Sequence, residues 1–141
     1  MWHAYQAVSR LVPDARPEAR LTPYRRGGVE VIAGARRDPD FGPILLFGSG
    51  GVLAEAVGDV AIRTLPCAQA ELEEMLEETR VAALLKGARG RPPVDRRALS
   101  LVLAGLARLI LSVPEVADVE VNPLRCFADE IVALDTRALL A

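Results

Sequence analysis

Apolar and polar residues follow one another along the chain with a period that differs from segment to segment. Residues 28–35 alternate with a period of two, which is typical of a strand. Residues 44–47 form a short continuous apolar run, which we interpret as a central strand, and residues 60–65 predict another strand. Residues 118–124 and 133–135 predict a final strand, turn and strand. These segments together predict a β-sheet.

Helical signals lie between the two groups of strands. Residues 68–78 are acidic with an apolar stripe, and residues 81–86 predict a second short helix. The clearest helix is expected over residues 96–113, where apolar residues recur three and four positions apart and the arginines lie off that stripe. Asp95 is a suitable N-cap for this helix, and Pro114 ends it.

The order of these elements predicts the fold class. Two strands joined by a short turn pair antiparallel, so we expect an α+β fold: a mostly antiparallel sheet with helices packed on one face. Residues 3–12 have a weak helical pattern bounded by Pro13, and we interpret residues 1–20 as an N-terminal helix and linker. Residues 21–141 are then expected to form one compact domain.

Composition excludes several classes of function. The net charge of −2 gives no reason to expect binding to nucleic acid or to an anionic membrane. The longest uncharged stretch of the main apolar segment, residues 98–107, is well short of the roughly 20 residues that a membrane span requires. Two cysteines, Cys67 and Cys126, make no disulfide framework and are expected to be buried thiols in a reducing compartment. We therefore expect a cytoplasmic protein.

Polar side chains at every second position of the segment 118–124 are the most informative feature of the chain. Because side chains alternate faces along a strand, Asp118, Glu120 and Asn122 should point the same way. Asp135 can join them if the next strand pairs back. Carboxylate and amide oxygens are the ligands that Mg²⁺ takes when phosphate and water complete its shell. The alternative is that these are solvent-facing residues of a half-buried hairpin.

Two other features could carry chemistry. The glycines of the run 48–51 could let backbone N–H groups converge on a phosphate, or could serve only a tight turn. Glu30 lies inside a strand and points away from its apolar neighbours, so it could also be a residue of a solvated strand face. The single histidine, His3, excludes a site built from several histidines within this chain.

Taken in order, several motifs resemble the ATP-grasp domain of ADP-forming (NDP-forming) acyl-CoA synthetases, which are relatives of the succinyl-CoA synthetase β subunit. The motifs are GVEVIAG at 28–34, DPDFGP at 38–43, FGSGGVLAE at 47–55, GARG at 87–90, VNPL at 121–124 and LD at 134–135. The resemblance runs from about Leu21 to the end of the chain and rests on the order and spacing of these motifs.

The resemblance implies an activity and a set of site residues. The reaction converts acyl-CoA, ADP and phosphate to acid, CoA and ATP, or the reverse, through a phosphohistidine. It implies that Asn122 and Asp135 bind the Mg²⁺ of the bound ATP or ADP. It places Glu30 after a nucleotide hinge that ends at Tyr24, whose backbone meets the adenine. It sets Gly50 and Gly51 near the point where phosphate passes to the partner histidine; no residue of this chain is expected to be catalytic by itself.

The resemblance also implies missing parts. A full domain of this kind extends further at its N-terminal side, where a lysine contacts the phosphates, and the CoA-binding domain with its phosphohistidine is separate. We therefore expect ligase-type activity only with the missing ATP-grasp half and a CoA-binding partner, and we expect an oligomer. The alternatives are a non-catalytic ATP-grasp remnant that acts as a binding or regulatory module, and an unrelated α+β domain that shares the turns.

Overall fold

The computed structural model describes residues 26–50, 58–88, 90 and 92–141. Three sequence predictions lie outside these ranges: the helix at 3–12, the hinge that ends at Tyr24, and the contribution of Gly51. The boundary expected near residue 20 lies outside them as well.

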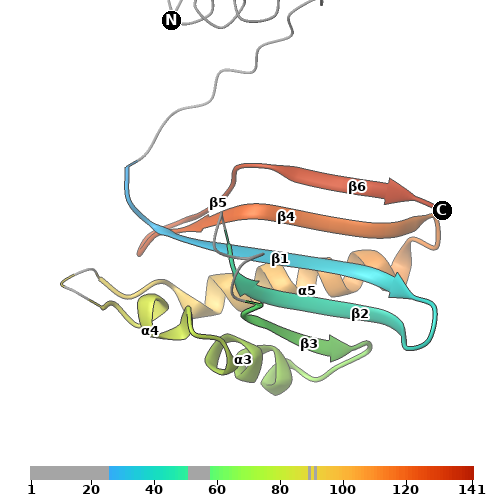
Figure 1. Ribbon diagram of the computed structural model, residues 1–141, viewed down its shortest axis with the longest axis horizontal. Helices are drawn as coiled ribbons and strands as arrows, with labels where there is room; N and C mark the ends of the chain where they lie inside the picture. The colour runs from blue at the N-terminus through green and yellow to red at the C-terminus, as the bar shows by residue number, and fades with distance from the viewer. Residues whose placement is uncertain (1–25, 51–57, 89, 91) are drawn as a thin grey trace, which may run out of the picture.

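The described part of the chain forms one antiparallel sheet with helices against it (Figure 1). In chain order the elements are β1 (Val29–Asp38), β2 (Gly42–Ser49), β3 (Val60–Thr64), α3 (Gln69–Glu78), α4 (Ala82–Leu85), α5 (Arg96–Ser112), β4 (Val116–Cys126), β5 (Ile131–Ala133) and β6 (Thr136–Leu140). The predicted α+β class with helices on one face of a mostly antiparallel sheet is confirmed.

The long strand β1 lies at the centre of the sheet. It pairs antiparallel with β2 on one side and with β4 on the other. The short strand β3 extends the sheet beyond β2. On the other side β5 and β6 pair with successive parts of the same strand β4, so together they form one interrupted edge. Figure 1 shows α5 running behind the middle of this sheet.

One face of the sheet forms the core with the helices. Val31 of β1, Phe47 of β2 and Val121 of β4 are buried on this face, together with Leu103 and Ile110 of α5. Alternate residues of the strands point to the opposite face, which no described helix covers. We refer to it below as the outer face of the sheet.

The helix predicted over residues 96–113 is present and begins where expected. α5 starts after Asp95, whose side chain accepts a hydrogen bond of 3.0 Å from the N–H of Ala98. Its stripe of buried residues matches the predicted one, with Leu99, Leu103 and Ile110 fully buried. Periodicity and a capping residue were sufficient here because both act within a few residues of chain.

The strand predicted over residues 118–124 is present and is longer than expected. β4 runs from Val116 to Cys126 without turning back. The Asn122–Pro123 segment within it forms a bulge, because Val31 pairs with Leu124 while Ala33 pairs with Val121, which leaves two β4 residues opposite one β1 residue. Proline has no N–H to give to a ladder, and an irregularity of this kind accommodates it.

The chain turns back only after β4 ends. The return follows at residues 127–130. The strand expected at 133–135 is wrong in its bounds, because Leu134 and Asp135 form the break between β5 and β6. Both cysteines are free thiols. Cys126 is buried as predicted, and burial raises the pKa of its thiol to about 12, whereas Cys67 is only partly buried. In the ranges that the structure describes, no helix is long and apolar enough to cross a membrane.

Candidate functional site

A row of polar side chains lies on β4, on the outer face. Val119 and Val121 are buried on the core face, and Asp118, Glu120 and Asn122 alternate with them. The side-chain amide of Asn122 donates from Nδ2 to Oε1 of Glu120 at 3.4 Å, so these two side chains lie on the same face. The alternation predicted from sequence is present because it is a property of any extended strand.

Arg137 of β6 lies against this row. It is directly opposite Glu120 in the register of β4 and β6. Its Nη2 atom is 3.8 Å from Oδ1 of Asp118 and 3.8 Å from Oε2 of Glu120. The guanidinium therefore faces two carboxylates at once.

Asp135 meets Asn122 through the backbone. The N–H of Asn122 donates to the carbonyl of Asp135 at 3.1 Å, and the N–H of Leu134 donates to the carbonyl of Pro123 at 3.1 Å. Asp135 is exposed, and its Oδ1 accepts a hydrogen bond of 2.9 Å from the N–H of Thr136. The two residues predicted as metal ligands are thus direct neighbours across the bulge, where β5 ends and β6 begins.

The donor atoms at this point suit a hard cation. Because the Nδ2 end of Asn122 is turned to Glu120, its Oδ1 atom remains as the oxygen donor of this side chain. Within the described ranges no group of three or more His, Cys, Asp and Glu side chains is placed to hold a metal ion. A cation here would take few protein oxygens and several from phosphate and water, which is typical of Mg²⁺ with a nucleotide.

Glu30 lies on β1, opposite Arg125 of β4. The two side chains form an ion pair in which Arg125 Nη2 donates to Glu30 Oε1. The carboxylate of Glu30 therefore has a protein partner on the outer face. A ligand that uses Glu30 would share it with Arg125 or displace Arg125.

The end of β2 packs closely against its neighbours. A Cβ on Gly48 would lie 2.1 Å from the carbonyl oxygen of Asp59, and a Cβ on Gly50 would lie 2.5 Å from the carbonyl carbon of Val31. The N–H of Gly50 donates to the carbonyl of Glu30 at 3.1 Å. Close approach of backbone explains these glycines, and the N–H of Gly50 is already occupied.

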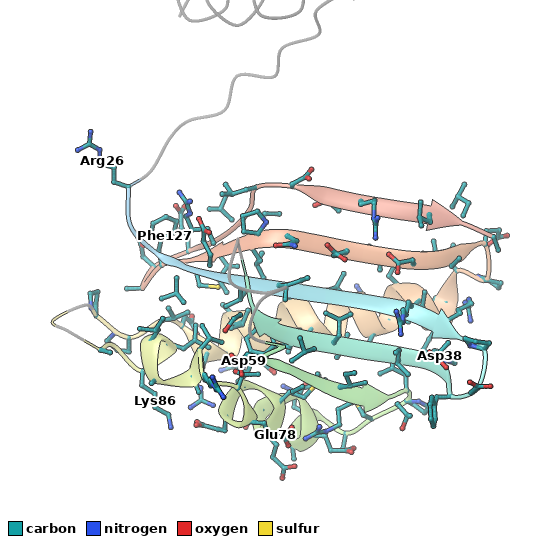
Figure 2. All side chains as sticks on the ribbon, in the orientation of Figure 1. Arg26, Asp38, Asp59, Glu78, Lys86 and Phe127 are labelled. Carbon is teal, nitrogen blue, oxygen red and sulfur yellow. The ribbon has the colours of Figure 1, made fainter. Side chains whose placement is uncertain are left out.

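Asp59 holds this end of β2 in place. Its carboxylate accepts hydrogen bonds from Ser49 Oγ at 2.5 Å and from the N–H groups of Arg80 and Val81 at 2.8 and 3.3 Å. Figure 2 shows Asp59 between the strands and the helices. Partial burial by itself raises the pKa of this carboxyl, but the three hydrogen bonds outweigh burial and the pKa is lowered.

The fold brings several of the predicted residues to one end of β1. Gly50 contacts β1 at Val31 from one side, and the bulge with Asn122 contacts it opposite Ile32 from the other. Adjacent strands lie about 4.8 Å apart, so these two elements are separated by about 10 Å. Glu30 and Asp135 belong to the same region through their backbone bonds to Gly50 and Asn122.

Sequence reasoning missed Arg137 and Asp59. A signal for Arg137 was present, because it lies two positions after Asp135 and so can share a strand face with it. No comparable signal exists for Asp59, since its partners Ser49 and Arg80 lie 10 and 21 residues away in sequence.

Comparison with known proteins shows which family this chain resembles. The model of the ATP-grasp domain family matches residues 1–140. The β subunit of ADP-forming acetate–CoA ligase I from Pyrococcus furiosus is 38% identical over 145 residues, covering 97% of this chain and 61% of that subunit. The chain thus spans about three fifths of the length of this relative.

Solved structures give the same result. Dinucleotide-forming acetyl-coenzyme A synthetase 1 from Ca. Korarchaeum cryptofilum, in complex with coenzyme A and Mg-AMPPCP, is 36% identical with a TM-score of 0.80. The match covers 84% of this chain and 55% of that one. The same enzyme with coenzyme A, acetyl-coenzyme A and a phosphorylated phosphohistidine segment gives a TM-score of 0.86 at 33% identity, covering 99% and 65%.

Proposed function

Because the chain belongs to the ATP-grasp domain family, we propose that it forms one half of a magnesium–nucleotide site of an ADP-forming acyl-CoA synthetase. The reaction of the whole enzyme would convert acyl-CoA, ADP and phosphate to a carboxylic acid, CoA and ATP. A phosphohistidine of a CoA-binding domain or subunit would carry the phosphoryl group. The similarity to acetate–CoA ligase and to acetyl-CoA synthetase supports this reaction class.

One observation carries the proposal. The backbone hydrogen bond between Asn122 of β4 and Asp135, which lies between β5 and β6, makes these two residues direct backbone neighbours. Asn122 is held with its Nδ2 toward Glu120, which leaves Oδ1 as its free oxygen donor. This is a minimal set of hard oxygen ligands, and it lies where the sequence motifs of the family predict the magnesium site.

The outer face offers different surfaces for the two ends of a nucleotide. Its β4 side carries the polar row, whereas its β3 side exposes the apolar residues Val60 and Ile62 at 42% and 53%. We propose that phosphates lie over the polar side near Asn122 and Asp135. Glu30 and Gly50 are proposed to border the nucleotide at the same end of β1. Gly51 and Tyr24 are proposed as nucleotide-binding residues from the sequence motifs alone.

The proposed division of labour follows from the chemistry of phosphoryl transfer. Bound Mg²⁺ would bridge phosphate oxygens and neutralise charge that develops during transfer. Asn122 and Asp135 would orient the phosphate chain by holding that ion. The remaining positive charge and the acyl-CoA site would come from the rest of the ATP-grasp domain and from the partner.

Nuclear magnetic resonance of the full chain tests the proposal at the level of single residues. Titration of the ¹⁵N-labelled chain with MgADP is expected to shift the side-chain amide signals of Asn122 and the backbone signals of residues 134–136. ADP with EDTA is expected to produce much smaller shifts, because the carboxylate and amide oxygens bind phosphate only through the cation. Millimolar affinity is sufficient for this measurement.

Two variants make the test specific. Asp135→Asn removes the charged ligand, and we expect it to weaken MgADP binding at least tenfold. Glu73→Gln removes the same charge from the exposed surface of α3 and is expected to bind as the wild type does. Unchanged MgADP binding by Asp135→Asn, or no magnesium-dependent shift in the wild type, would overturn the proposal.

A further inference from the structure

We infer that Arg137 is a nucleotide-binding residue that contacts the phosphate chain of a magnesium-bound nucleoside diphosphate, and that Asp118 and Glu120 hold its guanidinium over β4 until the nucleotide arrives. The inference rests on the proposed function, since it needs a magnesium–nucleotide site at Asn122 and Asp135. It adds a cation to a half-site for which only negatively charged and neutral ligands were expected.

The contacts of Arg137 are those of a loosely held side chain. Both carboxylates lie 3.8 Å from Nη2, a distance too long for a hydrogen bond, and the side chain is 60% exposed. An exposed ion pair of this kind stabilises a fold very little. Stability therefore does not account for the placement of Arg137 between two carboxylates.

The other arginines of the sheet make closer contacts. Arg125 pairs with Glu30, and Arg63 pairs with Glu78 through two hydrogen bonds. Arg37 donates to two backbone carbonyls at the end of α5 and to one at the start of β4. Arg36 donates to Asp38 at 3.4 Å. Among the described arginines of the strands, Arg137 is the one whose donors have no hydrogen-bonded partner.

Arg137 is also placed close to the proposed magnesium site. It follows Asp135 by two residues, and it lies opposite Glu120, the residue that contacts the Asn122 amide. Two residues along a strand span about 7 Å and neighbouring strands lie about 4.8 Å apart. A phosphate bound through Mg²⁺ at Asn122 and Asp135 is therefore within reach of a long, exposed arginine side chain.

Charge balance gives the physical reason for such a residue. Asp118 and Glu120 bring two negative charges to this part of the outer face, and the exposed Asp135 beside Asn122 adds a third, so together they would repel a diphosphate. The buried Oδ1 atom of Asp118 has no hydrogen-bond partner among the described residues, so Arg137 is its nearest compensation. A guanidinium matches phosphate oxygens with two parallel donors, and such charge-assisted bonds are stronger than its present contacts.

The experiment compares MgADP with AMP on the full chain, by the same ¹⁵N titration. For Arg137→Gln we expect MgADP binding to weaken on the order of 10- to 100-fold, the usual effect of losing a charged hydrogen bond. The affinity for AMP, which lacks the second phosphate, should change less than about threefold. Arg137→Lys should restore part of the affinity, and the side-chain Nε–H signal of wild-type Arg137 should shift with MgADP but not with AMP.

Arg36→Gln is the matched control. Arg36 lies on the same face, opposite Asp118 on the other side of β4, so the substitution removes an equal charge at a similar depth. Comparable losses in both variants, or equal losses for MgADP and AMP, would show a general field effect and overturn the inference. Wild-type affinity for MgADP in Arg137→Gln, together with a loss in Asp135→Asn, would overturn the role of Arg137 and leave the proposed function intact. Absence of MgADP binding in the wild type would overturn both.

Discussion

The carboxylate of Asp59 joins the end of β2 to the turn between α3 and α4. Its three donors, Ser49 Oγ and the N–H groups of Arg80 and Val81, stabilise the charged form more than partial burial disfavours it, so the pKa is lowered. A group with a lowered pKa in the folded state stabilises the fold above its unfolded pKa, which is about 3.9. That stabilisation is lost as the pH falls through the lower folded value.

Asp59→Asn tests this residue. At pH 7 we expect the free energy of unfolding to fall by about 1–2 kcal/mol, because charge-assisted hydrogen bonds become neutral ones. The difference from the wild type should shrink as the pH is lowered below about 4, where the wild-type carboxyl also becomes protonated. Urea unfolding at several pH values between 3 and 7 measures the loss of unfolding free energy at pH 7 and its decrease at lower pH. Asp40→Asn, at an exposed position of the β1–β2 turn, is the control, and a pH dependence equal to that of Asp59→Asn would contradict the assignment.

At the scale of elements, the C-terminal end of α5 is held by the central strand. The last carbonyls of a helix have no partner within it. Arg37 of β1 donates to the carbonyls of Ile110 and Val113 at this end and to that of Val116 at the start of β4. One side chain thus fixes how the helix passes into the strand that carries Asn122.

Removing this contact should destabilise the fold. Arg37→Ala is expected to lower the free energy of unfolding by about 2–3 kcal/mol, since it leaves partly buried carbonyls without their charged donor. Arg36→Ala changes the adjacent residue, which is exposed and whose ion pair among the described residues is with Asp38, and should change stability by less than about 0.5 kcal/mol. Thermal and urea unfolding of the two variants measure the difference. Equal effects would mean that the contacts of Arg37 with the end of α5 contribute nothing.

At the scale of the whole molecule, the two faces of the sheet have different environments. Within the described part of the chain, α3, α4 and α5 cover the core face, whereas the outer face carries the polar row of β4 and the exposed apolar residues of β3. The chain spans 61% of the length of the Pyrococcus furiosus subunit that it matches. We infer that the remaining part of such a domain closes over the outer face and completes the nucleotide site.

The chain alone is therefore expected to show little or no synthesis of ATP from acetyl-CoA, ADP and phosphate. Phosphoryl transfer depends on positioning and on stabilising charge from several sides, and half of a site does neither well. A coupled assay for ATP on the purified full chain measures this. Robust turnover that disappears in Asp135→Asn would contradict the need for a second half.

Local signals in the sequence were enough to predict the main helices and strands and to predict which side chains share one face of a strand. Periodicity and Asp95 determine α5, because capping and helical spacing act over a few residues. Alternation places Glu120 and Asn122 on one face of β4, because successive side chains of a strand point in opposite directions. The order of short motifs was enough to indicate the ATP-grasp family.

Only the tertiary structure decided how these pieces meet. Asn122 lies in a bulge of a continuous strand, because β1 pairs with β4 in shifted register on the two sides of it. Arg137 lies against Asp118 and Glu120, and Arg37 donates to the last carbonyls of α5. Both contacts form because the tertiary structure brings together residues that are far apart in sequence. Such contacts depend on register and on long-range packing, which local propensity does not encode.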